Sequence, residues 1–195
     1  MNSVATGRMA TDAEFEGSRA GPYPMGLMAI LATVSMLFAA FTAAILFRRT
    51  GIDWVPVPMP AIVWANTLIL LVSSGAVELA RASVRRDAAH LSIRWLAAAT
   101  VLGFLFLAGQ VFAWHMLAGL GVFLPTNPHA AFFYMLTAIH GAHVIGGLIA
   151  LSWTLNNARR GAYTPKNQSG LNHAAIYWHF IGGVWVYLLA VLSTF

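Results

Sequence analysis

The sequence predicts an all-α polytopic membrane protein, a bundle of five transmembrane helices. Five apolar stretches fill most of the 195-residue chain. Each is close to the roughly 20 residues that an α-helix needs to cross about 30 Å of hydrocarbon. Charged residues make up only 9% of the chain and lie almost entirely between the stretches. The predicted helices run over Met25–Phe47, Met59–Ala80, Trp95–Leu117, His129–Leu155 and Asn172–Phe195.

The segment before the first stretch, residues 1–23, mixes Arg, Asp and Glu with Gly, Ser and Thr. We expect it to be a cytoplasmic tail, and residues 24–195 to form the transmembrane domain. The first apolar stretch is too long for the hydrophobic region of a signal peptide. The chain has no cysteine, which excludes disulfides, iron–sulfur ligation and cysteine-type zinc sites.

Loop charges predict the orientation. With five spans, the N-terminus shares a side with the second and fourth loops. That side carries Arg8, Arg19, Arg81, Arg85, Arg86, Arg94, Arg159, Arg160 and Lys166, whereas the other carries only Arg48 and Arg49. Basic loops stay in the cytoplasm, so we expect a cytoplasmic N-terminus and an external C-terminus. The net charge of +5 comes with no nucleic-acid motif, so we assign it to orientation and expect no nucleic-acid partner.

Aromatic and small residues refine the picture of the spans. Tryptophans fall near the predicted span ends, where they are typical of the headgroup region: Trp54, Trp64, Trp95, Trp114, Trp153 and Trp178. Small residues let helix backbones approach closely in lipid. Their clustering in the fourth and fifth stretches predicts that these two helices are close neighbours, through Gly141, Gly146, Gly147, Gly182 and Gly183.

Few polar residues remain inside the spans. His140 and His143 are three residues apart and so share a helix face. Glu78 lies near the inner end of the second stretch, and His179 about two turns into the fifth. We expect Glu78, His140, His143 and His179 to form one structural polar layer in the inner half of the bundle.

Two other interpretations of this layer stay open. In one, His179 pairs with His140 or His143 as axial ligands of a b-type haem. In the other, the histidines hold a catalytic metal, but the chain has His140-Gly-Ala-His143 and not the His-Glu-x-x-His of zinc proteases. We favour hydrogen bonds between helices, with no catalytic residue and no metal ligand in this chain.

A basic group lies at the predicted inner surface beside an aromatic residue: Arg81, Arg85, Arg86, Arg94 and Trp95. Such a patch suits anionic headgroups, so we expect it to bind phospholipid. The chain has no Walker loop, Gly-rich dinucleotide turn, Gly-x-Ser-x-Gly elbow or acidic pair within a span. These features predict a helical scaffold or accessory subunit and not a self-sufficient enzyme or transporter.

Read in order, the spans resemble subunit III of the haem–copper respiratory oxidases, the cytochrome c oxidase subunit III family, in its short five-helix bacterial form. The first three stretches contribute Leu31-Ala-Thr-Val-Ser-Met-Leu-Phe-Ala-Ala-Phe41, Asn66-Thr-Leu-Ile-Leu-Leu-Val-Ser-Ser-Gly75 and Gly109-Gln110. The more specific matches are His140-Gly-Ala-His143-Val-Ile-Gly-Gly147 and Tyr177-Trp-His-Phe180 followed by Val184-Trp185. The resemblance covers the chain from about Gly26 to its C-terminus.

The resemblance implies a non-catalytic subunit that packs beside catalytic subunits I and II, stabilises the complex and binds phospholipid. Haem and copper would lie in the partner, with none in this chain. The complex, a cytochrome c or quinol oxidase of the bacterial plasma (inner) membrane, would reduce O₂ to water and pump protons in aerobic respiration. An accessory subunit of a nitric oxide reductase or of another respiratory complex is the nearest alternative, and a b-type cytochrome is the next.

The resemblance departs from the family at three carboxylates. The positions of the family's acidic residues fall at Val34, Ala113 and Gly182. The proton-related roles of those carboxylates are therefore not carried over to this chain.

Overall fold

The computed structural model describes residues 23–194. These residues form five α-helices and no strand, which confirms the predicted fold class. The helices are α2 (Tyr23–Arg48), α3 (Ala61–Arg85), α4 (Ala89–Gly119), α5 (Pro128–Arg159) and α6 (Ser169–Thr194). All five are long and apolar enough to cross a membrane. The predicted tail falls almost wholly outside the described residues.

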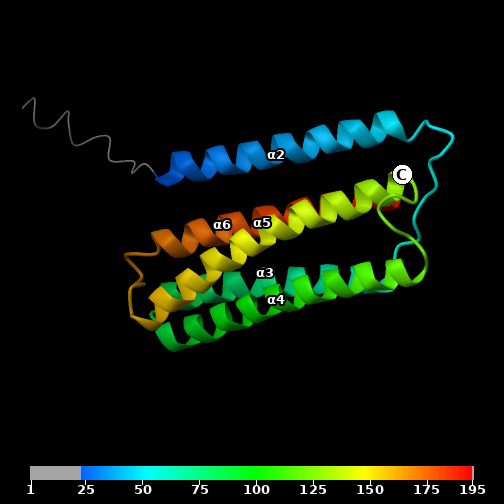
Figure 1. The fold of residues 1–195 in the computed structure, drawn as a ribbon. Coiled ribbons are helices and arrows are strands. Elements are labelled where there is room, and N and C mark those ends of the chain that lie inside the picture. The colour runs from blue at the N-terminus through cyan, green and yellow to red at the C-terminus, as the bar shows by residue number, and fades with distance from the viewer. Residues whose placement is uncertain (1–22, 195) are drawn as a thin grey trace, which may run out of the picture.

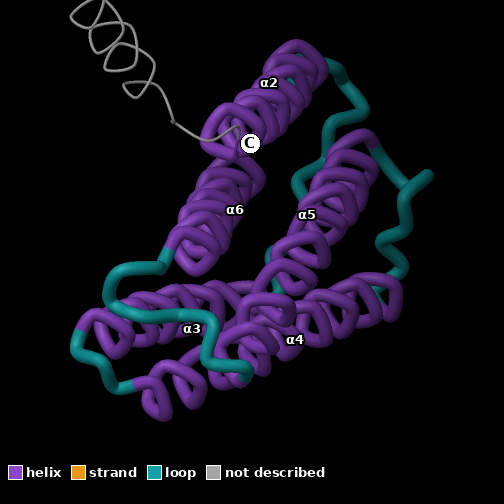
Figure 2. The backbone as a smooth tube through the Cα atoms, turned by 90° about the vertical axis from the view of Figure 1, so that its left-hand side faces the viewer, coloured by secondary structure: helices purple, strands orange, loops and turns teal. Residues whose placement is uncertain are grey.

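The helices run alternately up and down. One end of the bundle carries the start of α2 and the α3–α4 and α5–α6 connections, and the other carries the remaining connections and the end of α6 (Figure 1). α3 and α4 form the most extensive pair, α5 packs on α4, and α6 packs on both α3 and α5. α2 lies outermost and contacts only α5 and α6 (Figure 2). The basic residues Arg85, Arg86, Arg159, Arg160 and Lys166 therefore lie at one end.

The largest differences from the predicted helix ends lie at the α3–α4 connection. α3 continues past Ala80 to Arg85, and α4 begins at Ala89 instead of Trp95. The predicted loop shrinks to a three-residue turn in which Asp87 takes a φ of 57°, a left-handed conformation that Asp tolerates. Arg81 and Arg94, which bounded the predicted apolar stretches here, lie inside α3 and α4, because long basic side chains reach the headgroups from within a helix.

The core forms where α4, α5 and α6 approach each other around Trp178. A Cβ atom added at Gly103 of α4 would lie 2.7 Å from Trp178 Cη2, and one at Gly147 of α5 would lie 2.9 Å from Trp178 Cε3. The absence of side chains there admits the indole ring, which confirms the predicted closeness of α5 and α6. The prediction that Trp178 lies at headgroup depth is wrong, since it lies nine residues after the start of the 26-residue helix α6 and is only 1% exposed.

Candidate functional site

The most polar contact between helices joins α3 and α6. Glu78 Oε1 lies 2.7 Å from His179 Nε2 and accepts a hydrogen bond of 2.7 Å from Arg81 Nη1. Arg81 Nε in turn donates to Asn172 Oδ1 at 3.0 Å. We call Glu78, Arg81, Asn172 and His179 the α3–α6 polar cluster. It pairs a carboxylate with a guanidinium, so its two permanent charges compensate each other.

This cluster lies at the edge of the α3–α6 contact and not in its interior. The side chains of Glu78, His179 and Arg81 are 45%, 35% and 25% exposed, respectively. Arg81 was absent from the predicted layer, although its i, i+3 spacing from Glu78 is the usual spacing for a helical ion pair. The structure thus brings Glu78 and His179 together and adds Arg81 and Asn172.

His140 and His143 do not join this cluster. His140 is fully buried, with its ring centroid 5.1 Å from that of Trp185, 6.0 Å from Phe106 and 6.4 Å from Phe38. Among the described residues neither ring nitrogen of His140 has a hydrogen-bond partner. His143 Nδ1 lies 2.8 Å from the Ile139 carbonyl of its own helix. His140 therefore lies in an aromatic region between α2, α4, α5 and α6, whereas the half-buried ring of His143 contacts Phe38 of α2, with ring centroids 5.8 Å apart.

Hydrogen bonds from indole rings connect the helices elsewhere. Trp178 Nε1 donates to Ser73 Oγ at 3.2 Å, and Ser73 Oγ donates to the Ala99 carbonyl at 2.9 Å, which links α6, α3 and α4. Trp185 Nε1 donates to Thr67 Oγ1 at 3.0 Å. Sequence reasoning missed these links. The available signal was the set of serine and threonine residues inside otherwise apolar spans.

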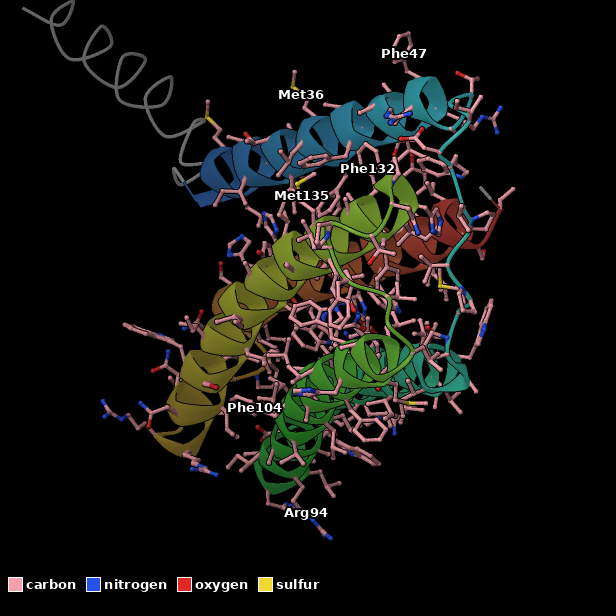
Figure 3. All side chains as sticks on the ribbon, turned by 45° about the vertical axis from the view of Figure 1, so that its right-hand side comes forward. Met36, Phe47, Arg94, Phe104, Phe132 and Met135 are labelled. Atoms are coloured by element: carbon pink, nitrogen blue, oxygen red, sulfur yellow. The ribbon has the colours of Figure 1, made fainter. Side chains whose placement is uncertain are left out.

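The predicted basic patch divides in two. Arg85, Arg86 and Arg94 are exposed near the α3–α4 turn, and Trp95 beside them is 38% exposed. Figure 3 shows Arg94 extending outward near the start of α4. Arg81 instead turns toward Glu78 and Asn172. Three arginines and Trp95 thus remain at the surface that the headgroups would meet.

Two largely apolar cavities flank α2. One of about 630 Å³ lies between α2, α4 and α5, and Phe132 and Met135 point into the space below α2 (Figure 3). The other, of about 510 Å³, lies between α2, α5 and α6, with Asn157, Tyr163 and His173 among its lining residues. In a bilayer, grooves of this polarity suit acyl chains.

The three positions at which the family carries carboxylates lie inside the bundle. Val34 and Ala113 are buried, and Gly182 is buried beside Ser74. Within residues 23–194 no group of three or more His, Asp or Glu side chains is placed to hold a metal ion.

Comparison with known proteins identifies the family. The profile of the family described as cytochrome c oxidase subunit III matches residues 11–195. The chain is 32% identical over 176 residues to a cytochrome c oxidase subunit 3 of Thermostichus vulcanus, covering 86% of this chain and 85% of that protein. It is 33% identical over 175 residues to the Synechocystis sp. protein of the same name, covering 86% and 73%.

A probable cytochrome c oxidase subunit 3 of Mycobacterium bovis is 28% identical over 173 residues, covering 86% of this chain and 85% of that protein. The family match over residues 11–195 runs through all five described helices. The segments with the most specific resemblance, around His140 on α5 and Trp178 on α6, pack against each other. This chain is therefore a multi-pass transmembrane protein that belongs to the cytochrome c oxidase subunit III family.

Proposed function

We propose that this chain is the non-catalytic subunit III of a haem–copper terminal oxidase, in which it packs beside the subunit that reduces O₂ to water and pumps protons. The family match over residues 11–195 carries the proposal. The interior of the bundle supports it, because indole–hydroxyl hydrogen bonds and tightly packed rings fill the space between α3, α4, α5 and α6. Such an interior provides rigidity.

Its role in the complex is to stabilise the catalytic subunit during turnover and to hold phospholipid. Arg85, Arg86, Arg94 and Trp95 form the headgroup site, since each basic residue near an anionic surface contributes about 1 kcal/mol. The apolar cavities beside α2 take acyl chains. Native mass spectrometry should show retained phospholipid that falls when the three arginines are replaced by Gln. If the variant retained as much phospholipid as the unsubstituted chain, the proposal of a headgroup site at these arginines would be wrong.

The b-type cytochrome alternative is not favoured by the packing. A haem ligated by His140 would need a porphyrin-sized space beside its ring, where Phe38, Phe106 and Trp185 lie. His179 is already in contact with Glu78. We expect the isolated chain to show no Soret band. A stoichiometric Soret band that disappears in His179→Ala would restore the cytochrome proposal.

The experiment that tests the proposed function is purification of the tagged full-length chain from its native membrane, followed by identification of its largest partner. A partner with haem and copper is expected. Haem together with non-haem iron would identify a nitric oxide reductase instead. Recovery of no haem protein would defeat both assignments.

The proposed location is the bacterial plasma membrane, with the N-terminus in the cytoplasm. Most of the basic residues of the described chain lie at the bundle end formed by the α3–α4 and α5–α6 connections, which supports a cytoplasmic position for that end. A reporter that is active only in the periplasm should give a signal when fused after Phe195. Activity of a cytoplasmic reporter at that position would reverse the orientation.

A further inference from the structure

The α3–α6 polar cluster lies well within a membrane span. Seven residues of α3 follow Glu78 before the helix ends at Arg85, which at 1.5 Å per residue is about 10 Å of helix. His179 is ten residues after the start of α6 at Ser169, which is about 15 Å. A charged group at such depth is costly when it faces acyl chains, and such groups normally face protein or a polar cavity.

One carboxylate oxygen of Glu78 has no partner in the described part of the chain. Both hydrogen-bonding neighbours, Arg81 and His179, contact Oε1, and none of the described residues donates to Oε2. With the Glu78 side chain 45% exposed, this oxygen faces the surroundings of the bundle. A carboxylate accepts several hydrogen bonds. A carboxylate oxygen that has no donor in a hydrocarbon environment costs several kcal/mol.

A protein partner explains the orientation of Arg81 in the α3–α6 polar cluster better than a lipid headgroup does. Arg81 lies three residues nearer the helix end than Glu78, where its side chain could extend toward the headgroups. It instead donates inward to Glu78 and sideways to Asn172. The neighbouring surface also permits close approach by another helix, because a Cβ added at exposed Gly75 would meet no atom within 4 Å.

We propose that this face of α3 and α6 is the surface on which a transmembrane helix of the larger partner subunit docks. That helix places a hydrogen-bond donor, from a hydroxyl, indole, amide or cationic side chain, against Oε2 of Glu78. The inference rests on the proposed function and deepens it by assigning the face of the subunit and the chemistry of the contact.

Photo-crosslinking in the intact complex tests the face directly. A photoreactive amino acid in place of Leu71, exposed on α3 and two turns before Glu78, should form an adduct with the larger subunit. The matched control is the same amino acid in place of Phe104, exposed on α4 (Figure 3), which should give little adduct. Adducts only with lipid, with the N-terminal segment or with a second copy of this chain would overturn the inference, as would a stronger adduct from Phe104.

Substitution of Glu78 tests the hydrogen bond. The amount of chain that stays with the haem subunit through detergent washing should fall about tenfold or more for Glu78→Leu, and clearly less for Glu78→Gln, which keeps an acceptor. Equal retention of Glu78→Leu and the unsubstituted chain would contradict the contact. Recovery of the haem–copper partner by the unsubstituted chain tests the proposed function separately, so either idea can fail alone.

Discussion

α2 and the four-helix unit of α3–α6 are held in the bundle in different ways. Indole N–H groups of α6 bond to hydroxyls of α3, and Ser73 of α3 bonds to the α4 backbone. On α2 the hydroxyls of Thr33, Ser35 and Thr42 bond to their own helix. One hydrogen bond between side chains, Tyr187 Oη to Thr42 Oγ1 at 2.9 Å, joins α2 to α6.

Packing shows the same contrast. Of the α2 side chains whose burial the structure describes, only Val34, Phe38 and Ile45 are buried against the rest of the bundle, and Met36 and Phe47 point away from it (Figure 3). In lipid, apolar side chains gain little by exchanging acyl chains for protein, so close packing and hydrogen bonds must hold helices together. α3–α6 have both, whereas α2 relies on a narrow contact flanked by cavities. The four helices are therefore the rigid unit, and α2 is the element most easily displaced.

The largest effect should come from the Trp178 contact in the rigid unit. Gly103→Ala places a methyl group 2.7 Å from Trp178 Cη2, so we expect a loss of about 1–3 kcal/mol in the free energy of unfolding. Gly141→Ala on α5 is the control, because its nearest neighbour, Leu107 Cδ2, would be 4.0 Å away. Unfolding of both variants in mixed micelles measures the difference. Equal stabilities would show that the packing around Trp178 is loose.

A smaller effect is expected from the hydrogen bonds, and here the two regions can be compared directly. Ser73→Ala removes the acceptor of Trp178 Nε1 and the donor to the Ala99 carbonyl, and should cost about 1 kcal/mol. Tyr187→Phe removes the bond to Thr42 on α2 at an exposed site and should cost less, about 0.5 kcal/mol or nothing. The same unfolding measurement applies, and the reverse order would contradict the contrast between α2 and α3–α6.

The smallest effect belongs to the loop that follows α2. A hydrogen bond from the Arg48 guanidinium to Asp53, at 2.8 Å, lowers the pKa of this carboxyl below its ordinary value of 3.8. The stabilisation of the folded state by this pair is fully present above the ordinary pKa of Asp53. It is lost as the pH falls through the lowered pKa. Because both groups are exposed, Asp53→Asn should change stability little at pH 7 and flatten its pH dependence below about pH 4. A large loss at pH 7 would show that this pair anchors α2.

Much of the fold follows from the sequence because bilayer thickness fixes how long an apolar stretch must be. The five apolar stretches predicted the five helices and their order. The helix ends were less predictable, since Arg81 follows an apolar run without ending α3 and Arg94 precedes one without beginning α4. The contacts of Trp178 were not predictable either, because an indole near a span end suits both the headgroup region and a core lined by glycines.

The polar residues show a similar limit. Spacing places His140 and His143 near each other on α5. The two rings nevertheless have different surroundings, because the neighbouring helices cover His140 completely and His143 only in part. The pairing of Glu78 with His179 depends on how α3 and α6 align, which periodicity does not determine. The Glu78–Arg81 pair is local and was available from the sequence.

In the proposed function, this chain stabilises a catalytic partner without taking part in the chemistry. The most direct measurement follows O₂ consumption over many turnovers by the complete complex and by the complex depleted of this chain. We expect the depleted complex to begin at a rate close to that of the complete complex and then to lose activity progressively. An initial rate near zero, or an unchanged working life, would contradict it.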